Sequence, residues 1–137
     1  MSRSRVFFDS NVPLYLLSED LAKAEKAEAL LAQGGVISVQ VLNESARVLS
    51  RKRLLGWDEI DEFLRTLRVV CEVRPLTVDI HENALALARR HGFAFFDALI
   101  VACALEAGCD TLYSEDFQHG MRVADRLSIL NPFLPAL

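Results

Sequence analysis

The sequence feature that most constrains the fold is an uninterrupted apolar run at residues 98–105, directly after Asp97. A helix formed by this run is apolar on every side, so other elements must cover it. The run is much shorter than the ~20 residues that a helix needs to cross a membrane. We therefore predict a central helix that opens at Asp97, ends at Gly108 and lies in the core of a folded domain, with no membrane association.

Short apolar segments alternate with amphipathic helical segments along the chain. The expected strands cover residues 5–8, 36–39, 69–73, 111–113 and 128–130. The expected helices include residues 11–13, 21–32, 41–49 and 57–67, and a segment capped by Thr77 or Asp79 that ends near Gly92. Apolar strands that alternate with helices are typical of a mostly parallel sheet covered on both faces. The sequence therefore predicts one α/β domain over residues 1–137, with three α/β/α layers around a central sheet of about five strands.

Four acidic residues stand where hydrophobic elements end. Asp9 follows the first expected strand, Asp116 follows the fourth, Asp97 opens the apolar helix, and Glu44 lies on the flank of its helix's apolar stripe. In parallel sheets, ligands bind outside the carboxyl ends of the strands, so all four side chains can face one crevice. Carboxylates beside buried elements are costly unless something compensates them, and their convergence predicts a bound divalent cation.

Composition and charge limit the function classes. Of 137 residues, 52% are hydrophobic and 25% are charged, which excludes a disordered or collagen-like chain. The formal net charge of −4 argues mildly against a nucleic-acid partner, since duplex binders carry a basic excess. A cation held by the carboxylates would leave the remaining surface nearly neutral, and some basic residues are grouped locally: Arg47, Arg51, Lys52 and Arg53.

The cysteines and the N-terminus bear on the compartment. Cys71, Cys103 and Cys109 form no C-x-x-C pair, and Cys103 lies inside the apolar run, where a small hydrophobic residue serves as well. Only three apolar residues stand between the basic N-terminus and Asp9, far fewer than a secretory signal needs. We therefore expect reduced thiols and a cytoplasmic location.

Four motifs together resemble one protein family. They read F-D-S-N-V at residues 8–12, N-E at 43–44, F-D-A-L-I-V-A at 96–102 and L-Y-S-E-D-F-Q-H-G at 112–120. In this order and at these spacings the chain closely resembles the PIN-domain family over nearly its whole length, in particular VapC-like toxins of prokaryotic toxin–antitoxin pairs. The resemblance implies a Mg²⁺- or Mn²⁺-dependent ribonuclease that a small antitoxin protein holds inactive.

The same resemblance implies the roles of individual residues. It assigns metal binding and catalysis to four acids with two supporting residues: Asp9, Glu44, Asp97 and Asp116, supported by Asn11 and Ser114. The chain departs from the pattern after the last of these acids, where many relatives have a further acid and this sequence has Gln118, His119 and Gly120. Either His119 or Glu115 could replace that acid.

The expected chemistry is hydrolysis of an RNA phosphodiester bond. Carboxylate oxygens suit Mg²⁺ or Mn²⁺, and the metal would activate water and neutralise charge that grows on the phosphate, leaving a 5′-phosphate and a 3′-hydroxyl. Glu44 would ligate the metal or orient water, and Ser114 would hydrogen-bond a ligating carboxylate. Single-stranded RNA is the expected substrate, because its bases can be splayed into a groove, with Arg47, Arg51 and Arg122 as phosphate contacts.

Each acid also has a simpler explanation when it is taken alone. Asp97 can cap its helix, Asp9 and Asp116 can stand in ordinary turns, and Glu44 can pair with Arg47 on a solvated face. Four unrelated causes would then have to bring carboxylates to one edge of one sheet. We therefore favour the shared site.

Other functions and assemblies are open at this point. An aspartate-dependent phosphatase or receiver domain uses a late lysine to hold phosphate, and this chain has no lysine after Lys52. A non-catalytic PIN-like module that only binds a partner would gain stability by replacing crowded carboxylates. Apolar residues around Leu54, Leu55 and Trp57 favour a homodimer.

Overall fold

The computed structural model describes residues 4–52 and 55–135. These residues form a six-stranded sheet with strand order β3-β2-β1-β4-β6-β5. The strands are β1 (Val6–Phe8), β2 (Gly35–Ser38), β3 (Cys71–Arg74), β4 (Thr111–Tyr113), β5 (Arg122–Val123) and β6 (Leu127–Leu130). Every neighbouring pair is parallel except β5 with β6. The predicted mostly parallel sheet is confirmed, with one strand more than expected. Arg53 and Leu54, named above for a basic group and a dimer contact, lie outside the described residues.

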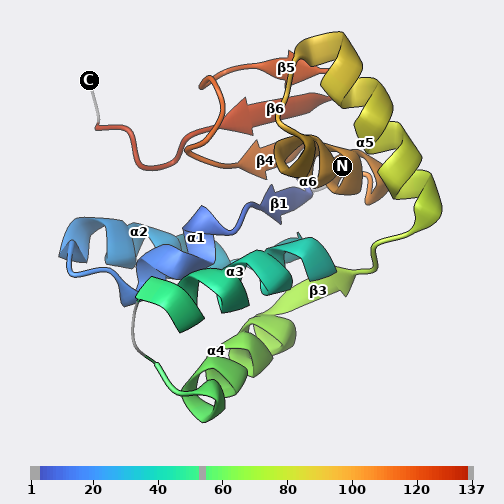
Figure 1. Cartoon of the computed structure of the whole chain (residues 1–137). Coiled ribbons are helices and arrows are strands. Elements are labelled where there is room, and N and C mark those ends of the chain that lie inside the picture. Colours follow the sequence, from blue (N-terminus) through green and yellow to red (C-terminus); the bar gives the residue numbers. More distant parts are fainter. Residues whose placement is uncertain (1–3, 53–54, 136–137) are drawn as a thin grey trace.

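Helices cover both faces of the sheet. They are α1 (Asn11–Leu14), the 3₁₀ helix η1 (Tyr15–Leu17), α2 (Leu21–Ala32), α3 (Val39–Lys52), α4 (Trp57–Val70), α5 (Val78–His91) and α6 (Phe95–Glu106). In Figure 1, α2, α3 and α4 are grouped together, and α5 packs beside α6. Right-handed crossovers between parallel strands place helices on opposite faces in this way when the strand order reverses. The predicted three-layer α/β/α arrangement is confirmed.

Helix α6 forms the centre of the core. Its residues 98–104 are all buried, as the apolar run predicts. The helix begins at Phe95, two residues earlier than expected, with Ala94 at the N-cap position and no side-chain cap bond. Asp97 therefore lies in the first turn, and the interpretation of Asp97 as the helix N-cap is wrong. A carboxylate in a first turn still benefits from the helix dipole.

One strand boundary differs from the sequence prediction. Val69 and Val70, expected at the start of the third strand, are the last residues of α4, and Val69 is 84% exposed. The buried residues Ile60 and Leu67 lie seven positions apart, which is two helical turns. These two residues define the buried face of α4, the helix continues past them to Val70, and β3 begins only at Cys71.

The expected strand at 128–130 is β6, and it forms a short hairpin with β5, which no sequence pattern predicts. The turn between its strands places Ala124 and Asp125 at φ values of 54° and 53°, a left-handed conformation that usually calls for Gly or Asn. The Arg122 guanidinium donates hydrogen bonds to the Asp125 carbonyl (2.8 Å) and to Ser128 Oγ (3.0 Å), which holds the turn. Without glycine in the turn, this strand was missed.

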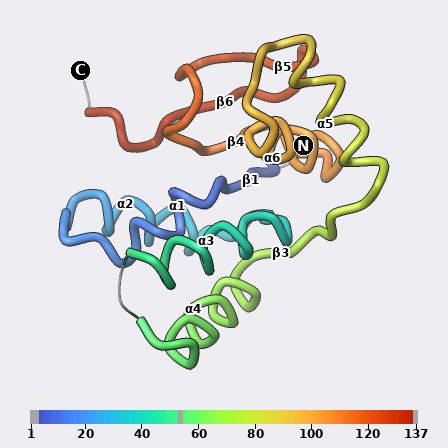
Figure 2. Tube along the Cα trace, in the orientation of Figure 1, coloured from blue at the N-terminus to red at the C-terminus, as the bar shows by residue number. Residues whose placement is uncertain are grey.

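The sheet brings the ends of β1, β2 and β4 together. The Asp9 amide donates to the Tyr113 carbonyl (3.0 Å), so Asp9 continues the pairing of β1 with β4. Strand β2 passes directly into α3, where Ser38 Oγ accepts from the Val41 amide (3.4 Å). Close approach of β1 and β2 requires Gly35, because a Cβ there would stand 2.4 Å from the Phe8 ring. Figure 2 shows the chain returning after β6 toward α1 and α2.

No helix in the described ranges, 4–52 and 55–135, combines the length and the hydropathy that a membrane span requires.

Candidate functional site

Asp9 is the most deeply buried acid of the site, with 3% of its surface exposed. Its carboxylate accepts hydrogen bonds from the Ser10 amide (2.8 Å) and from Ser114 Oγ (2.7 Å). Burial raises the pKa of Asp9 to about 6; the two hydrogen bonds oppose the rise, and the charges of Asp116 and Asp97 add to it. A buried carboxylate whose two donors are neutral, and which forms no ion pair with the described residues, retains a strong affinity for positive charge.

Ser114 joins three parts of the site. Besides donating to Asp9, its hydroxyl oxygen accepts from the Asp116 amide (3.1 Å) and from Asn11 Nδ2 (3.4 Å). The Asn11 amide also donates to Asp116 Oδ2 (3.1 Å), and its own oxygen accepts from the Glu115 amide (3.4 Å). These bonds tie the start of α1 to the loop after β4 and fix the positions of two carboxylates.

Glu44 reaches the site from the second turn of α3, because that helix begins directly at the end of β2. Its Oε1 atom is buried and makes no hydrogen bond to any of the described residues. Burial raises the pKa of Glu44 to about 7, and the charges of Asp9, Asp97 and Asp116 raise it further against a weaker opposing effect of Arg47. The proposed surface pair with Arg47 therefore does not account for Glu44.

Asp97 completes the group from the first turn of α6. Burial raises its pKa, and the Asp116 carboxylate adds to that shift. Four elements that lie far apart in the sequence thus bring together four acids that act on one another electrostatically: Asp9, Glu44, Asp97 and Asp116. We call these residues the carboxylate cluster.

The donors of the carboxylate cluster fit a hard divalent cation in chemistry. All are carboxylate oxygens, the ligands that Mg²⁺ and Mn²⁺ prefer, and the unpartnered Glu44 Oε1 points to a missing positive partner. Within residues 4–52 and 55–135, however, no three His, Cys, Asp or Glu side chains already stand in a metal-binding arrangement. Mutual repulsion keeps like charges apart, so these side chains would have to draw together around a cation.

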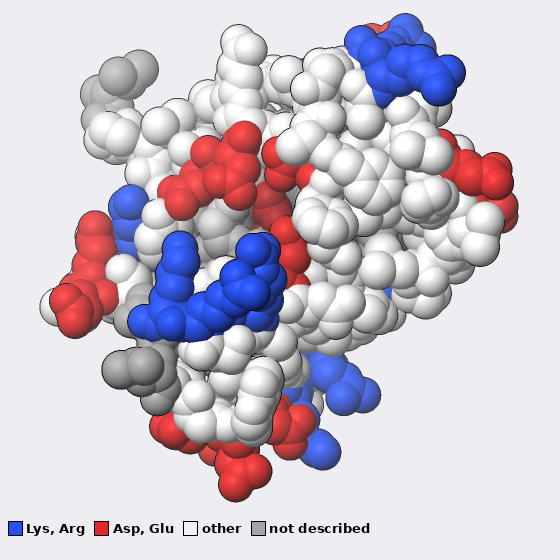
Figure 3. Space-filling model, viewed as in Figure 1, with Lys and Arg blue, Asp and Glu red and all other residues white. Residues whose placement is uncertain are grey.

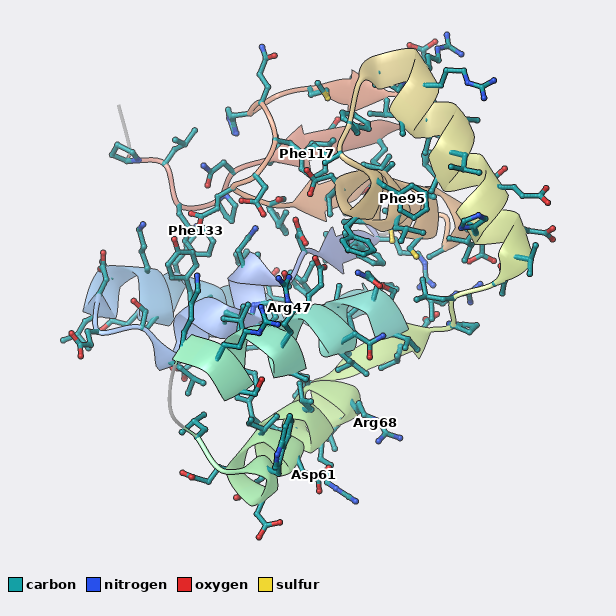
Figure 4. All side chains as sticks on the ribbon, in the orientation of Figure 1. Arg47, Asp61, Arg68, Phe95, Phe117 and Phe133 are labelled. Carbon is teal, nitrogen blue, oxygen red and sulfur yellow. The ribbon has the colours of Figure 1, made fainter. Side chains whose placement is uncertain are left out.

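A shallow hollow continues from the carboxylate cluster along α1 and the end of α3. Its lining residues are Ser10, Asn11, Leu14, Tyr15, Ser18, Val48, Lys52, Glu115 and Asp116. Figure 3 shows acidic atoms near the middle of this face directly beside a group of basic atoms. Arg47 projects from α3 near α1 (Figure 4), and Arg51 and Lys52 end the same helix. Cations thus border the acids on one side.

Three residues named from the sequence lie in other settings. Arg122 belongs to β5 at the outer edge of the sheet and is bound to its own hairpin, so it does not border the carboxylate cluster. His119 is exposed, and its Nδ1 accepts from the Asn131 amide (2.9 Å). The Glu115 carboxylate accepts from the Tyr15 hydroxyl through both oxygens (2.6 and 2.8 Å). His119 and Glu115 therefore each have a hydrogen-bond partner outside the carboxylate cluster.

A family model described as PIN domain matches residues 6–126. A comparison with curated protein sequences finds no match.

Several solved structures share the fold at low sequence identity. VapC20 of Mycobacterium tuberculosis, described as a Sarcin-Ricin loop cleaving toxin, is 24% identical with a TM-score of 0.66, over 81% of this chain and 89% of that chain. A toxin–antitoxin complex from Klebsiella pneumoniae is 19% identical with a TM-score of 0.69, over 93% and 98%. VapBC2 of Rickettsia felis, bound to a DNA fragment from its promoter, is 18% identical with a TM-score of 0.66, over 90% and 96%.

Proposed function

This chain belongs to the PIN domain family, and we propose that it is a Mg²⁺- or Mn²⁺-dependent endoribonuclease, the toxin of a type II toxin–antitoxin pair. The observation that carries the proposal is the carboxylate cluster, in which the pKa values of Asp9 and Glu44 are raised to about 6 and about 7. A fold that had no use for these acids would be more stable without them. The cost of keeping four carboxylates together supports a functional site.

Each residue of the cluster has a proposed role. Asp9, Asp97 and Asp116 would hold the metal ion, and Glu44 would hold it as well or orient the attacking water. Ser114 and Asn11 keep Asp9 and Asp116 in place through their hydrogen bonds. The bound cation would supply Lewis-acid stabilisation of charge on the phosphate and would make water a better nucleophile. The products would carry a 5′-phosphate and a 3′-hydroxyl.

Single-stranded RNA is the proposed substrate. Four acids repel a polyphosphate chain, so cations must attract it to the site. The basic residues of α3, Arg47, Arg51 and Lys52, would contact phosphates on one side of the bond to be cut. Arg122 no longer belongs to this set. An open hollow accepts a flexible strand or loop more readily than a regular duplex, whose base edges stay hidden.

The proposed protein partner is a small antitoxin. The Klebsiella pneumoniae relative is a toxin–antitoxin complex, and the Rickettsia felis relative binds a DNA fragment from its promoter. If this chain is such a toxin, the product of a small adjacent open reading frame should co-purify with it and suppress its activity. A homodimer is also proposed: Trp57 at the start of α4 is 70% exposed, and its replacement by Lys should shift the mass measured by light scattering to that of a monomer.

The experiment that tests the function is cleavage of total cellular RNA by the purified protein, in Mn²⁺ or in EDTA, with the new ends mapped. Wild type is compared with Asp97→Asn, which keeps the shape of the side chain and removes its charge. Cuts that require metal, carry 5′-phosphates and disappear in Asp97→Asn would support the nuclease.

The alternative is a PIN-like module that binds a partner without catalysis. One observation favours it, namely that no three described acids already stand in a metal-binding arrangement. This alternative predicts that neither metal nor Asp97→Asn changes any cleavage, and that Mn²⁺ leaves the melting temperature of the wild type unchanged. Metal-induced stabilisation of the wild type would reject it, because a ligand stabilises only a protein that binds it.

A further inference from the structure

Two sets of hydrogen bonds hold the loop that carries Asp116, one on the side of the carboxylate cluster and one on the opposite side. Inside, Asn11 and Ser114 bond to the carboxylate and the amide of Asp116. Outside, the Tyr15 hydroxyl donates to both oxygens of the neighbouring Glu115, at 2.6 and 2.8 Å. Hydrogen bonds to a carboxylate are stronger than those between neutral groups, so this second fastening holds the loop firmly.

Both fastenings come from one short helical segment. Asn11 lies in α1 and Tyr15 begins η1, four residues later. Residues four apart in a helix share a face, so the two side chains can bind the adjacent loop residues Asp116 and Glu115. A shift of this segment would move Asp116 and Glu115 together.

Tyr15 is itself fixed by two neighbours. Its ring packs on Phe133 with a centroid distance of 4.4 Å, and Lys23 Nζ lies 3.3 Å from the hydroxyl and 4.9 Å from the ring centroid. Lys23 donates to the hydroxyl while the hydroxyl donates to Glu115, and hydrogen bonds linked in this way strengthen one another. Phe133 belongs to the segment after β6 that returns toward α1 and α2 (Figures 2 and 4).

The charges of this group are balanced. Lys23 and Glu115 carry opposite charges at the two sides of the Tyr15 hydroxyl, and Glu115 is occupied through both oxygens. Glu115 therefore has a different use from the acids of the carboxylate cluster, although it stands between Ser114 and Asp116 in the sequence.

We propose that Tyr15 is a positioning residue of the metal site: by binding the Glu115 carboxylate it holds the 114–116 loop, and with it Asp116, where a divalent cation can be bound. This role rests on the proposed function. Tyr15 touches neither substrate nor metal, and it acts only through Glu115. Residues that orient metal ligands commonly change metal affinity by about 10- to 100-fold when they are replaced.

The test is a double-mutant cycle on Mn²⁺ affinity, measured by calorimetry on the full chain. Tyr15→Phe removes only the hydroxyl and keeps the ring on Phe133, so the metal-free melting temperature should change little. We expect Tyr15→Phe and Glu115→Ala each to weaken Mn²⁺ binding about tenfold, and the double variant to be no weaker than either single variant. Glu115→Gln, which can still accept from the hydroxyl, should retain most of the affinity.

Tyr113→Phe is the matched control, since it removes the hydroxyl of the only other tyrosine in the sequence. It should bind Mn²⁺ as the wild type does. Unchanged affinity in Tyr15→Phe, or losses that multiply in the double variant, would overturn the role assigned to Tyr15. These affinities do not depend on RNA cleavage, so the cycle alone supports or refutes the positioning role, whatever the cleavage assay with total RNA shows.

Discussion

The two ends of helix α6 place acidic side chains in opposite surroundings. At the C-terminal end, Glu106 accepts two hydrogen bonds from Arg74, at 2.8 and 2.9 Å. Nearby, Glu72 accepts from Arg5 and from Arg74, and these bonds lower its pKa. Arg5 also donates to the Ala107 carbonyl (2.7 Å), which ties β1 to the end of the helix. Every acid in this network has an arginine partner.

At the N-terminal end of α6, no acid of the carboxylate cluster forms an ion pair with any of the described residues. Asp97 faces the rest of the carboxylate cluster, the pKa values of Asp9, Glu44 and Asp97 are raised, and Glu44 Oε1 is buried without a partner among the described residues. The comparison shows that acids with a structural role, at the C-terminal end of α6, are paired with arginines. At the N-terminal end of the same helix, the carboxylate cluster has no such partners and can bind a cation from solution.

The largest expected effect separates the two ends by activity. Glu44→Gln should reduce metal-dependent RNA cleavage by at least about 1000-fold, because it removes a charge that the cation and its water depend on. Glu106→Gln, the same substitution at the other end of α6, should stay within about twofold of wild type, since surface ion pairs contribute little. Initial cleavage rates at saturating Mn²⁺ measure both. Equal losses of cleavage rate in the two variants would contradict the proposed difference between the two ends of α6.

A second difference appears in the pH dependence of stability without metal. Asp9 and Glu44 have pKa values raised from 3.8 to about 6 and from 4.5 to about 7. Acids with raised pKa values stabilise the fold while protonated, and this contribution is lost as pH rises through the folded-state values. The free energy of unfolding should therefore fall between about pH 4 and pH 7, by about 3 kcal/mol for Asp9.

Urea titrations in EDTA at several pH values measure this slope. Asp97→Asn should make the free energy of unfolding less dependent on pH and should raise it above pH 7, because the negative charge of Asp97 no longer repels the other acids. The Glu72 pKa is lowered, so its contribution is lost only as pH falls, and Glu72→Gln should leave the slope between about pH 5 and pH 7 unchanged. A stability that rises over this range would contradict the electrostatic description of the cluster.

The smallest expected effect concerns the ion pairs themselves. Glu106→Ala removes a partner of Arg74 that is 40% exposed, and the loss should be about 1 kcal/mol or less. Urea unfolding at pH 7.5 measures it, with Arg65→Ala, which breaks the more exposed pair with Asp61, as the comparison. If Glu106→Ala lowered the free energy of unfolding as much as a core cavity does, the ion pairs of Arg74 would be essential to the fold. The proposed difference between the two ends of α6 would then be wrong.

Much of the fold could be predicted because its signals are local. The apolar run at 98–105 and the alternation of strands and helices can be read directly from the sequence, and the predicted PIN family is confirmed by the match over residues 6–126. Strand β5 (Arg122–Val123) is not predicted from the sequence, because it is two residues long and the turn that follows it lacks glycine. The limit of α4 differs from the prediction because β-branched Val69 and Val70 favour strands, whereas the helix continues to Val70.

The candidate site was only partly open to prediction. The four acids could be named because each ends or flanks a hydrophobic element, and the hydrogen bond between Ser114 and Asp9 follows from the meeting of β1 with β4. The contact of Tyr15 with Glu115 spans 100 positions in the sequence and depends on where η1 ends up beside the loop after β4. No local pattern marks such a contact, and none marks Arg122 as bound within its own hairpin.

The most direct test of the central claim is calorimetric titration of Mn²⁺ into the metal-free protein at pH 7.5, with wild type, Glu44→Gln and Glu106→Gln side by side. We predict saturable binding to wild type and to Glu106→Gln, and at least a tenfold weaker affinity for Glu44→Gln. Equal affinities for Glu44→Gln and wild type, or no binding to the wild type, would contradict the claim that the carboxylate cluster at the start of α6 is a cation site.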